Sequence, residues 1–258
     1  MPKTLSSKLS IMNQLIHADC LDAMQEIADK SIDLVVTSPP YNMRTRIRNG
    51  EYTEREKSDH FSKKYDTFHD AYPIDTYYEI HKRAINEMLR ISKLVFINIQ
   101  IVTGSKEAWF RLIGEFATKI RDIIIWDKGN GQPAMHGSVI NKGSELILAM
   151  ESSAIAGRAF DTSYFERGKM QDIWRLGRGD SSFDGHNAVF PLSLPTMIIS
   201  NWTKPDDIVC DPFAGVMTTA IACINLKRRY ICIEKDKDIF DRGAQRVNDR
   251  LNQMELEL

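Results

Sequence analysis

Two prolines and a tyrosine end an apolar segment in the sequence DLVVTSPPYN at 33–42. Pro39 and Pro40 have no backbone N–H and a fixed φ, so a strand cannot continue through them. The carbonyls of Ser38 and Pro39 therefore lose local competitors for hydrogen bonding. Tyr41 adds a flat aromatic face with a polar tip. These residues could grip a planar group that carries an amine, although a plain strand terminator would give the same pattern.

A second candidate site lies in IVCDPFAG at 208–215, where Asp211 ends a predicted strand. Gly215 then stands in a tight turn before a predicted helix, whose first amides are unpaired, and a ligand can approach such a backbone closely. Glu234 ends the next predicted strand, 19 residues beyond Gly215. That spacing is near the roughly 20 residues expected for an acid that binds ribose hydroxyls. The pattern predicts a nucleoside-binding site.

The ligand of this site is not expected to be a dinucleotide. The turn has one glycine where the dinucleotide motif GxGxxG has three, and the Asp211 carboxylate would repel a pyrophosphate. A cationic or neutral nucleoside suits Asp211 better, and a merely structural turn is the alternative. Asp19 is a third acid at a predicted strand end, in QLIHAD, but it could serve only as the N-cap of the helical segment CLDAMQEI that follows.

Seven short apolar segments alternate with segments of helical period, which is typical of α/β architecture. They predict a mostly parallel seven-stranded sheet with helices on both faces, in which ligands collect at the carboxyl ends of the strands. IIIW and ELILAM could instead form an antiparallel pair at one edge. The predicted strands are QLIHAD, DLVVTS, KLVFINI, DIIIW, ELILAM, DIVCD and RYICIE, and the predicted helices span 75–92, 105–119, 192–201, 217–226 and 236–252.

The composition is that of an ordinary globular chain. Its 258 residues, 43% hydrophobic and 27% charged, suffice for one α/β domain with a small insertion. A net charge of −1 gives no overall signal for a polyanionic partner. No apolar run reaches the roughly 18 residues of a membrane span, so we expect a cytoplasmic protein. The four cysteines lack CxxC spacing and the six histidines do not cluster, so we expect core cysteines and no metal site.

Two segments do not fit the sheet pattern. Residues 43–72 are polar and irregular with mixed charges, and residues 151–186 combine glycines and arginines with Tyr164, Phe165 and Trp174. Loops this long in a compact domain are usually functional or disordered. We expect the first segment to be irregular, either a solvated surface loop or a functional loop. The aromatic residues of the second indicate packing, and we expect a small folded insertion there.

TSPPY at 37–41 together with DPFAG at 211–215 resembles the exocyclic-amino DNA methyltransferases that use S-adenosylmethionine. The motif order matches their beta group, in which the catalytic motif precedes the cofactor motif. HADCLDAMQEIADK, IIIWDKGNG and HNAVFPLSLPTMIISNWTKPDDIVCDPFAG also look like segments of this family. The resemblance implies a Rossmann-like fold with permuted motifs, divided into a catalytic half at 1–150, a target-recognition insertion at 151–186 and a cofactor-binding half at 187–258.

The resemblance assigns roles residue by residue. Asp211 would hold the methionine part of the cofactor, Glu234 the ribose hydroxyls and Asp19 the adenine. One departure is clear, because the family commonly continues its motif as Gly-Ser-Gly-Thr-Thr, whereas Val216 and Met217 stand at the second and third of these positions. The turn has therefore lost a glycine. The implied cofactor contacts are Asp19, Asn187, Pro191, Asp211, Pro212, Phe213, Gly215, Thr218 and Glu234.

The implied reaction is methyl transfer to an exocyclic amine of a base, catalysed by Ser38, Pro39, Pro40 and Tyr41. Hydrogen bonds from the amine to Ser38 and to the Pro39 carbonyl would localise the nitrogen lone pair and aim it at the sulfonium methyl group. The base must leave the duplex, and Tyr41 would stack on it. In the family, serine at this position favours N4 of cytosine over N6 of adenine. No cysteine follows a proline, so carbon-5 methylation is not expected.

The resemblance also implies partners: double-stranded DNA, a second copy in a homodimer, and a cognate restriction endonuclease. Two other functions stay open, namely a nucleic-acid-binding module with a vestigial cofactor site and an RNA or protein amino-methyltransferase. The motif order of the last class is generally the reverse of that seen here. The residues hypothesised to contact DNA phosphates are Arg44, Arg46, Arg48, Lys63, Lys64, Arg175 and Arg178.

Overall fold

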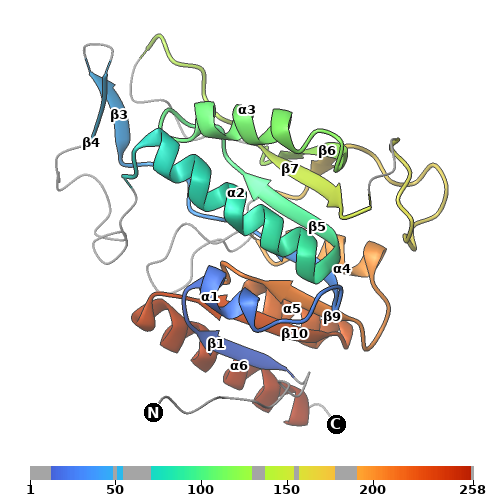
Figure 1. The fold of residues 1–258 in the computed structure, drawn as a ribbon. Coiled ribbons are helices and arrows are strands. Elements are labelled where there is room, and N and C mark those ends of the chain that lie inside the picture. Colours follow the sequence, from blue (N-terminus) through green and yellow to red (C-terminus); the bar gives the residue numbers. More distant parts are fainter. Residues whose placement is uncertain are drawn as a thin grey trace.

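An eight-stranded sheet runs through the centre of the molecule in the order β1-β10-β9-β2-β5-β7-β6-β8 (Figure 1). The computed structural model describes residues 13–48, 51–54, 71–129, 137–153, 157–177 and 191–256. All seven predicted strands are confirmed, but the predicted total is wrong by one because β8 extends the sheet. The strands are β1 (Gln14–His17), β2 (Ile32–Thr37), β5 (Ser92–Ile99), β6 (Ile120–Asp127), β7 (Ser144–Glu151), β8 (Ile173–Arg175), β9 (Ile208–Asp211) and β10 (Arg229–Glu234).

The sheet is mixed rather than wholly parallel. In the part of the sheet ordered β1-β10-β9-β2-β5, adjacent strands are parallel. β7 runs antiparallel to both β5 and β6, so the antiparallel pairing of IIIW with ELILAM is confirmed. β8 pairs in parallel with the outer side of β6 and forms the edge. The parallel strands therefore bring their carboxyl ends to one edge of the sheet.

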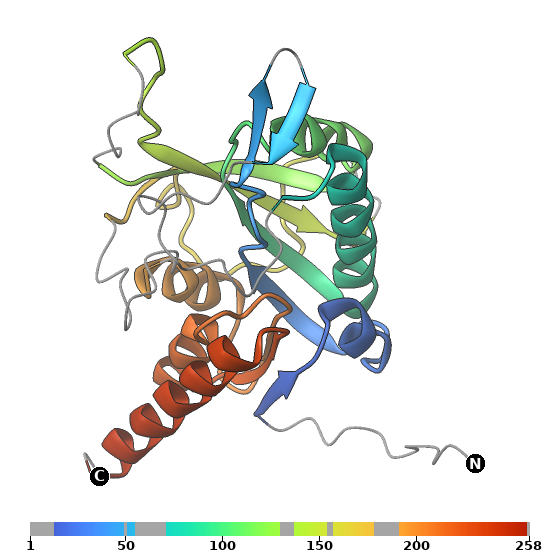
Figure 2. The same ribbon diagram turned by 90° about the vertical axis from the view of Figure 1, so that its left-hand side faces the viewer.

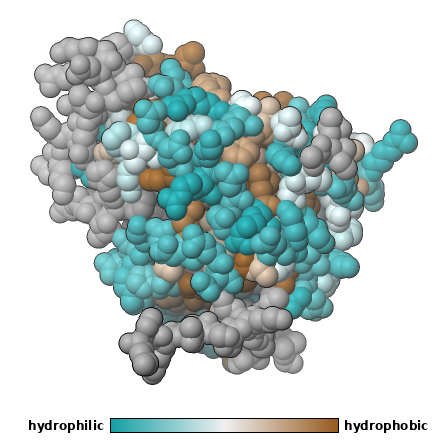
Figure 3. Space-filling view, viewed as in Figure 1, coloured by the Kyte–Doolittle hydropathy of each residue, from teal (hydrophilic) through white to brown (hydrophobic). Residues whose placement is uncertain are grey.

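The described helices divide between the two faces of the sheet, as predicted. α1 (Cys20–Gln25), α2 (Ile74–Ile91) and α3 (Lys106–Glu115) cover one face, and α4 (Ser193–Trp202), α5 (Thr218–Leu226) and α6 (Lys237–Leu256) cover the other. Successive strand residues point to opposite faces. In β5, Val95 packs with the first set of helices and Phe96 with the second. The outward surface over α2 and α3 is mostly hydrophilic (Figure 3).

A two-stranded ribbon follows the turn formed by residues 38–41, which we call the Pro-Pro turn, in the segment where we predicted an irregular loop. β3 (Thr45–Arg48) and β4 (Glu51–Glu54) pair in antiparallel register and project from the body of the molecule (Figure 2). The prediction is wrong for these strands because TRIR and EYTE each hold one apolar residue. A short two-stranded ribbon buries little, so its sequence carries no apolar periodicity.

Asn42 anchors the base of this ribbon to the rest of the molecule. Its φ is 57°, a left-handed conformation that asparagine tolerates better than most residues. The amide nitrogen donates to the carbonyls of Tyr72 at 2.9 Å and Gly104 at 2.7 Å. A Cβ atom at Gly104 would lie 2.0 Å from the Asn42 carbonyl oxygen, so only glycine fits there. The chain leaving the Pro-Pro turn is thus fixed against the loop after β5.

The described part of the second irregular segment packs on α4 through aromatic rings. The rings of Phe160, Phe165 and Trp174 lie 5.4, 5.2 and 6.2 Å from the ring of Trp202. Trp174 is buried and Phe165 is half-buried, which confirms the predicted packing, whereas Tyr164 is 50% exposed. Aromatic contacts of this kind bury large apolar surfaces, and they hold residues 157–177 against the sheet.

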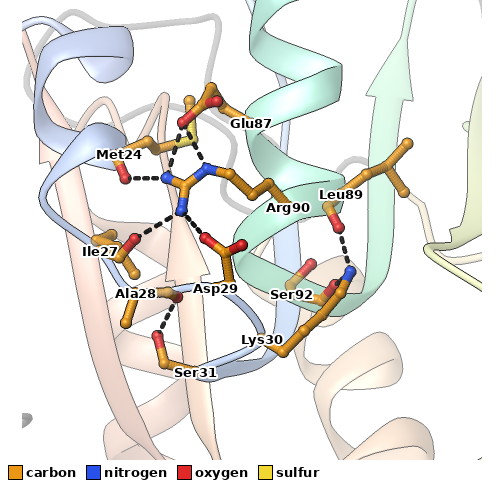
Figure 4. Close-up of polar contacts among 10 residues, drawn as sticks. All are labelled: Met24, Ile27, Ala28, Asp29, Lys30, Ser31, Glu87, Leu89, Arg90 and Ser92. Atoms are coloured by element: carbon orange, nitrogen blue, oxygen red, sulfur yellow. Dashed lines mark hydrogen bonds and ion pairs between the residues drawn. The ribbon is translucent and has the colours of Figure 1, made fainter.

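Two basic side chains brace the amino edge of the sheet, opposite the strand ends just described (Figure 4). Arg90, in the last turn of α2, donates to the carbonyl of Met24 in α1 at 2.7 Å. Lys30, in the turn after α1, donates to the carbonyl of Leu89 at the end of α2 at 2.5 Å. The last carbonyls of a helix have no partner within it. Each of the two helix ends is therefore satisfied by a side chain from the other segment.

The four cysteines, Cys20, Cys210, Cys223 and Cys232, are all buried and free, which confirms that they are core residues. Burial raises the pKa of the Cys20 thiol to about 12, so it stays protonated and unreactive at neutral pH. None of the described helices has the length and apolar character that crossing a membrane requires.

Candidate active site

Four neighbouring parallel strands, β1, β10, β9 and β2, end side by side. The register pairs His17 with Glu234 and Cys232 with Asp211, so the acids that end or follow these strands lie at one edge. Ser38 directly follows β2, the neighbour of β9. The two motifs, far apart in the sequence, therefore meet where open α/β sheets bind ligands.

Asp211 joins the two motifs. Its side chain is fully buried. Oδ1 accepts hydrogen bonds from the Thr37 hydroxyl at 2.7 Å and the Phe213 amide at 3.1 Å, and Oδ2 accepts from the Thr219 hydroxyl at 2.6 Å. Burial raises the pKa of Asp211 to about 6, and the hydrogen bonds only partly offset it. A cation placed nearby would favour the ionised form of this carboxyl.

Glu234 shapes the glycine turn. Its Oε2 accepts from the amide of Gly215 at 2.9 Å, and its Oε1 accepts from the amide of Asp236 at 2.8 Å. Gly215 has a φ of 51°, which glycine adopts without strain. Burial raises the pKa of Glu234, while the backbone amides act in the opposite direction. The carboxylate therefore holds the turn from the neighbouring strand end.

Asp19 is the N-cap of α1. It also belongs to the group of acids at the ends of β1, β10 and β9, namely Asp19, Glu234 and Asp211, which we call the acidic edge. Its Oδ1 accepts from the amide of Leu21 at 2.9 Å, which confirms the capping role. Its Oδ2 accepts from the ammonium of Lys235 at 3.0 Å. Burial alone would raise the pKa of Asp19, but Lys235 and the amide of Leu21 hold it below its ordinary value. The carboxylate is thus ionised beside the strand end that carries Glu234.

The turn after β9 departs from the family pattern at Met217. This residue is buried with a φ of 63°, a conformation in which most side chains are strained. A Cβ atom at Gly243, on α6, would lie 2.5 Å from Met217 Cγ, so the absence of a side chain there makes room for the methionine. Arg246 donates to the Val216 carbonyl at 3.1 Å and to Thr218 Oγ1 at 2.9 Å. Together, Gly243 and Arg246 fix the path of the altered turn.

The Pro-Pro turn is held from α2 and by its own tyrosine. The Tyr77 hydroxyl donates to the Pro40 carbonyl at 2.6 Å, so that carbonyl already has a donor. The hydroxyls of Ser38 and Tyr41 lie 2.7 Å apart. Burial, with the Glu145 carboxylate alongside, raises the pKa of the Tyr41 phenol well above its ordinary range, so the phenol keeps its proton.

A chain of rings connects the turn after β9 with the Pro-Pro turn. Phe213 stacks parallel to His81, with centroids 6.3 Å apart, and His81 lies 3.9 Å from the ring of Tyr77, which bonds to Pro40. Burial lowers the pKa of His81 to about 4, so the imidazole is neutral at neutral pH. Phe213 and Pro40 therefore belong to one packed unit of the structure.

Sequence reasoning missed three polar residues behind the Pro-Pro turn. The Asn98 amide nitrogen donates to Tyr41 Oη at 2.8 Å and to Glu145 Oε2 at 2.7 Å. The Tyr41 hydroxyl also donates to Glu145 Oε2 at 3.0 Å, and the ammonium of Lys128 donates to Glu145 Oε1 at 2.8 Å. A buried charge requires a partner, but the position of Glu145 at the start of the apolar segment ELILAM does not reveal its burial, so the sequence carried no sufficient signal for this group.

For the remaining predicted site residues, the structure gives a place in the fold, except for those that lie outside the described residues. Pro191 and Thr218 are buried near the starts of α4 and α5. Pro212 follows Asp211 in the turn, and the backbones of Arg46 and Arg48 lie in β3, after Arg44. Arg175 ends the edge strand β8, with Nε 3.6 Å from an oxygen of Asp127. Outside the described residues lie Asn187, Lys63, Lys64 and Arg178.

The chain has curated relatives along most of its length. It is 25% identical over 256 residues to the Type II methyltransferase M.HinfI of Haemophilus influenzae, which covers 92% of this chain and 69% of that protein. It is also 25% identical over 253 residues to the Type II methyltransferase M2.MboI of Moraxella bovis, covering 91% of this chain and 87% of that protein. Both names describe methyltransferases.

Solved structures share the fold. The PvuII DNA methyltransferase, described as cytosine-N4-specific, aligns with a TM-score of 0.68 at 16% identity, covering 94% of this chain and 92% of that one. A Thermus thermophilus protein described as a candidate DNA modification methylase aligns with a TM-score of 0.65 at 21% identity, covering 92% of this chain and 95% of that one. These likenesses confirm the predicted α/β class.

A family model named for N6 and N4 methyltransferases and described as a DNA methylase matches residues 32–245. The matched region contains the Pro-Pro turn, the ring chain through His81 and the turn at Gly215. Because the match spans most of the chain and both motifs, this chain belongs to the N6/N4 DNA methylase family.

Proposed function

We propose that this DNA amino-methyltransferase binds S-adenosylmethionine where β1, β10 and β9 end, and methylates N4 of a flipped cytosine held by residues 38–41. One observation carries the proposal: the hydroxyl of Thr37, which adjoins the Pro-Pro turn, donates to Asp211 at 2.7 Å. This bond fixes the amine-binding turn directly against the cofactor motif. Methyl transfer requires such a fixed distance between the two reactants.

The acidic edge fits S-adenosylmethionine, which supplies an electrophilic methyl group when bound. The cofactor carries positive charge at its sulfonium and ammonium groups. Asp211 is buried, and its pKa is raised to about 6, so a cation bound nearby would stabilise its ionised form. Glu234 and Asp19 end or follow the two adjacent strands and suit the ribose hydroxyls and the adenine, respectively. Phe213, packed on His81, offers an apolar wall.

The turn itself restricts how an amine can be held. Because the Pro40 carbonyl already accepts from Tyr77, the acceptors we assign to the amine are the Ser38 hydroxyl and the Pro39 carbonyl. Two such bonds localise the nitrogen lone pair and orient it. Serine at position 38 supports cytosine N4 as the target, and adenine N6 is the alternative.

The wider assignment follows from the same function. We assign residues 1–150 to the catalytic half, 151–186 to target recognition and 187–258 to the cofactor-binding half. A homodimer, a cognate restriction endonuclease and action in the cytoplasm on double-stranded DNA complete the proposal. The residues proposed to contact phosphates are Arg44, Arg46, Arg48, Lys63, Lys64, Arg175 and Arg178.

Mass spectrometry of nucleosides tests the proposal directly. Unmethylated DNA is incubated with the protein and S-adenosylmethionine, digested, and analysed for N4-methylcytosine and N6-methyladenine. We expect N4-methylcytosine, and a Tyr41→Ala control should give less because the stacking surface for the base is lost. Finding only N6-methyladenine would overturn the base assignment. Finding neither product, with DNA still bound, would favour a binding module with a vestigial cofactor site.

A further inference from the structure

The polar residues behind the Pro-Pro turn form one connected network that the reaction described so far does not use. Glu145 is 8% exposed and Asn98 is 2% exposed. In the Lys128–Glu145 ion pair the two side chains are 8% and 9% exposed. Burying an ion pair costs desolvation free energy, which well-packed apolar side chains of similar volume would not cost. A buried pair in contact with Tyr41 therefore calls for a role beyond stability.

The donors and acceptors of this network can be counted. The Tyr41 hydroxyl has one hydrogen, and it donates this hydrogen to Glu145 Oε2 at 3.0 Å. Tyr41 Oη must then accept in its other contacts, which are the Asn98 amide nitrogen at 2.8 Å and the Ser38 hydroxyl at 2.7 Å. Ser38 is thus the donor in the Ser38–Tyr41 bond.

This direction decides what Ser38 offers to a substrate. Because its single hydrogen is directed to Tyr41, Ser38 Oγ retains only lone pairs for other partners. One of these faces the Asn98 amide nitrogen at 3.4 Å, and the other can accept an N–H of a substrate amine. A serine hydroxyl would otherwise be free to rotate and to present its hydrogen to the amine, which is itself a donor.

We propose that Glu145, held by Lys128, is a positioning residue that acts through Tyr41 to keep the Ser38 hydroxyl an acceptor for the target amine. The inference rests on the proposed function and adds a residue to it. It explains why a carboxylate is buried behind a tyrosine whose stacking face alone would need no hydrogen-bond partner. It also gives the tyrosine hydroxyl, as well as its ring, a part in the reaction.

Glu145→Gln should release the direction of the network. The ammonium of Lys128 can only donate, so it draws the Gln oxygen, and the Gln NH₂ group then faces Tyr41. The Asn98 amide nitrogen, which also faces this position, would meet a second donor, and the amide can rotate because its Oδ1 has no partner among the described residues. Tyr41 can then donate to Ser38 or to the Asn98 oxygen instead of to one fixed carboxylate, so Ser38 is free to point its own hydrogen at the amine.

The test compares single-turnover methylation by the wild type, Glu145→Gln, Tyr41→Phe and the double variant, with S-adenosylmethionine binding measured by calorimetry. We expect Glu145→Gln to slow methyl transfer roughly tenfold, the equivalent of one lost hydrogen bond, with unchanged cofactor affinity. In the Tyr41→Phe background the same substitution should have no further effect. Glu145→Asp, which keeps the charge but shortens the side chain, should be slowed similarly and serves if the glutamine variant does not fold.

The surface of the molecule offers a matched control. Glu115 accepts from the Tyr78 hydroxyl and pairs with Lys82 at 2.6 Å, the same trio of residue types on α2 and α3. Glu115→Gln should methylate at the wild-type rate. Wild-type rates for Glu145→Gln, or an equal loss in both Tyr41 backgrounds, would overturn the inference. An inactive wild type would instead overturn the proposed function, so the two failures are distinguishable.

Discussion

Asp211 shows how one buried carboxyl can serve structure and ligand at once. Three hydrogen bonds tie it to β2, to its own turn and to α5, yet burial still raises its pKa to about 6. The hydrogen bonds therefore recover only part of the hydration that the carboxylate loses. A cationic ligand could offset the rest of the lost hydration, and its binding would lower the pKa of Asp211.

Cofactor affinity should consequently depend on pH. In the free protein the pKa of Asp211 is about 6, so this carboxyl is protonated at lower pH. Binding a cation there must first release that proton. Affinity for S-adenosylmethionine should rise roughly tenfold between about pH 5 and about pH 7. Isothermal titration calorimetry at both values checks this.

The control for this prediction is Asp211→Asn, which keeps the side-chain shape but cannot ionise. Its affinity should be weak and nearly flat over the same range. Glu234 also has a raised pKa, so the difference between the two proteins, rather than the wild-type slope alone, identifies Asp211. Equal slopes in both proteins would assign the pH dependence to another group.

At the scale of elements, strands were predictable where burial makes the signal local. β2, β5 and β7 are apolar on both sides because helices cover both faces of the sheet, and such runs are visible in the sequence. β3, β4 and β8 are three or four residues long. β3 and β4 pair with each other in a short ribbon, which needs no apolar periodicity. β8 pairs with β6, far earlier in the chain, so no single window of the sequence contains that information.

The candidate site divides in the same way. Ser38 and Tyr41 lie in one short motif, and Asp211 and Gly215 lie in another, so the sequence alone predicts both. Glu145 contacts Tyr41 across 104 positions of the chain. An isolated charge at a strand start is indistinguishable from an exposed one until the fold buries it, so this part of the site could not be predicted.

The packing of α6 on the altered turn gives a prediction at this scale. A side chain at Gly243 would meet Met217 Cγ at 2.5 Å. Gly243→Ala should therefore lower the free energy of unfolding by about 1–3 kcal/mol, as overpacking of a core does. Met217→Gly relieves the left-handed backbone but removes a buried side chain, and should also destabilise.

The double variant should lose about 1 kcal/mol less unfolding free energy than the sum of the two single variants. The reason is that Met217→Gly removes the Cγ atom with which the new Cβ atom of Gly243→Ala would clash. Urea denaturation of the four proteins measures this coupling. The recovery should be incomplete, since the same Cβ atom would still lie 3.1 Å from the Gly215 carbonyl. Strictly additive effects would show that α6 does not compensate for the missing glycine.

At the scale of the whole molecule, the two edges of the sheet have different tasks. The amino edge is closed by reciprocal capping from Arg90 and Lys30. The carboxyl edge gathers Asp19, Glu234 and Asp211, with the Pro-Pro turn beside them. Because β2 lies between β9 and β5, a motif from each half of the sequence reaches the same place. The permuted motif order therefore leaves the spatial site intact.

His81 joins these halves inside the core, and its burial should govern acid stability. Its pKa falls from 6.5 to about 4 on folding. Between these values the unfolded chain binds a proton that the folded chain does not, so stability falls as pH is lowered through this window. Asp211, whose pKa is raised on folding, acts in the opposite direction at acidic pH. A direct comparison of variants is therefore needed to isolate His81.

His81→Phe keeps a ring between Phe213 and Tyr77 but cannot titrate. Between about pH 7 and about pH 5, the wild type should lose about 2 kcal/mol of unfolding free energy relative to this variant. Loss of the hydrogen bond from His81 to the Tyr77 carbonyl shifts the variant equally at both values and cancels from the comparison. Urea titrations at the two pH values supply the four free energies. Parallel pH profiles would mean that His81 is hydrated or paired in the folded protein, and the ring chain would then not be a dry part of the core.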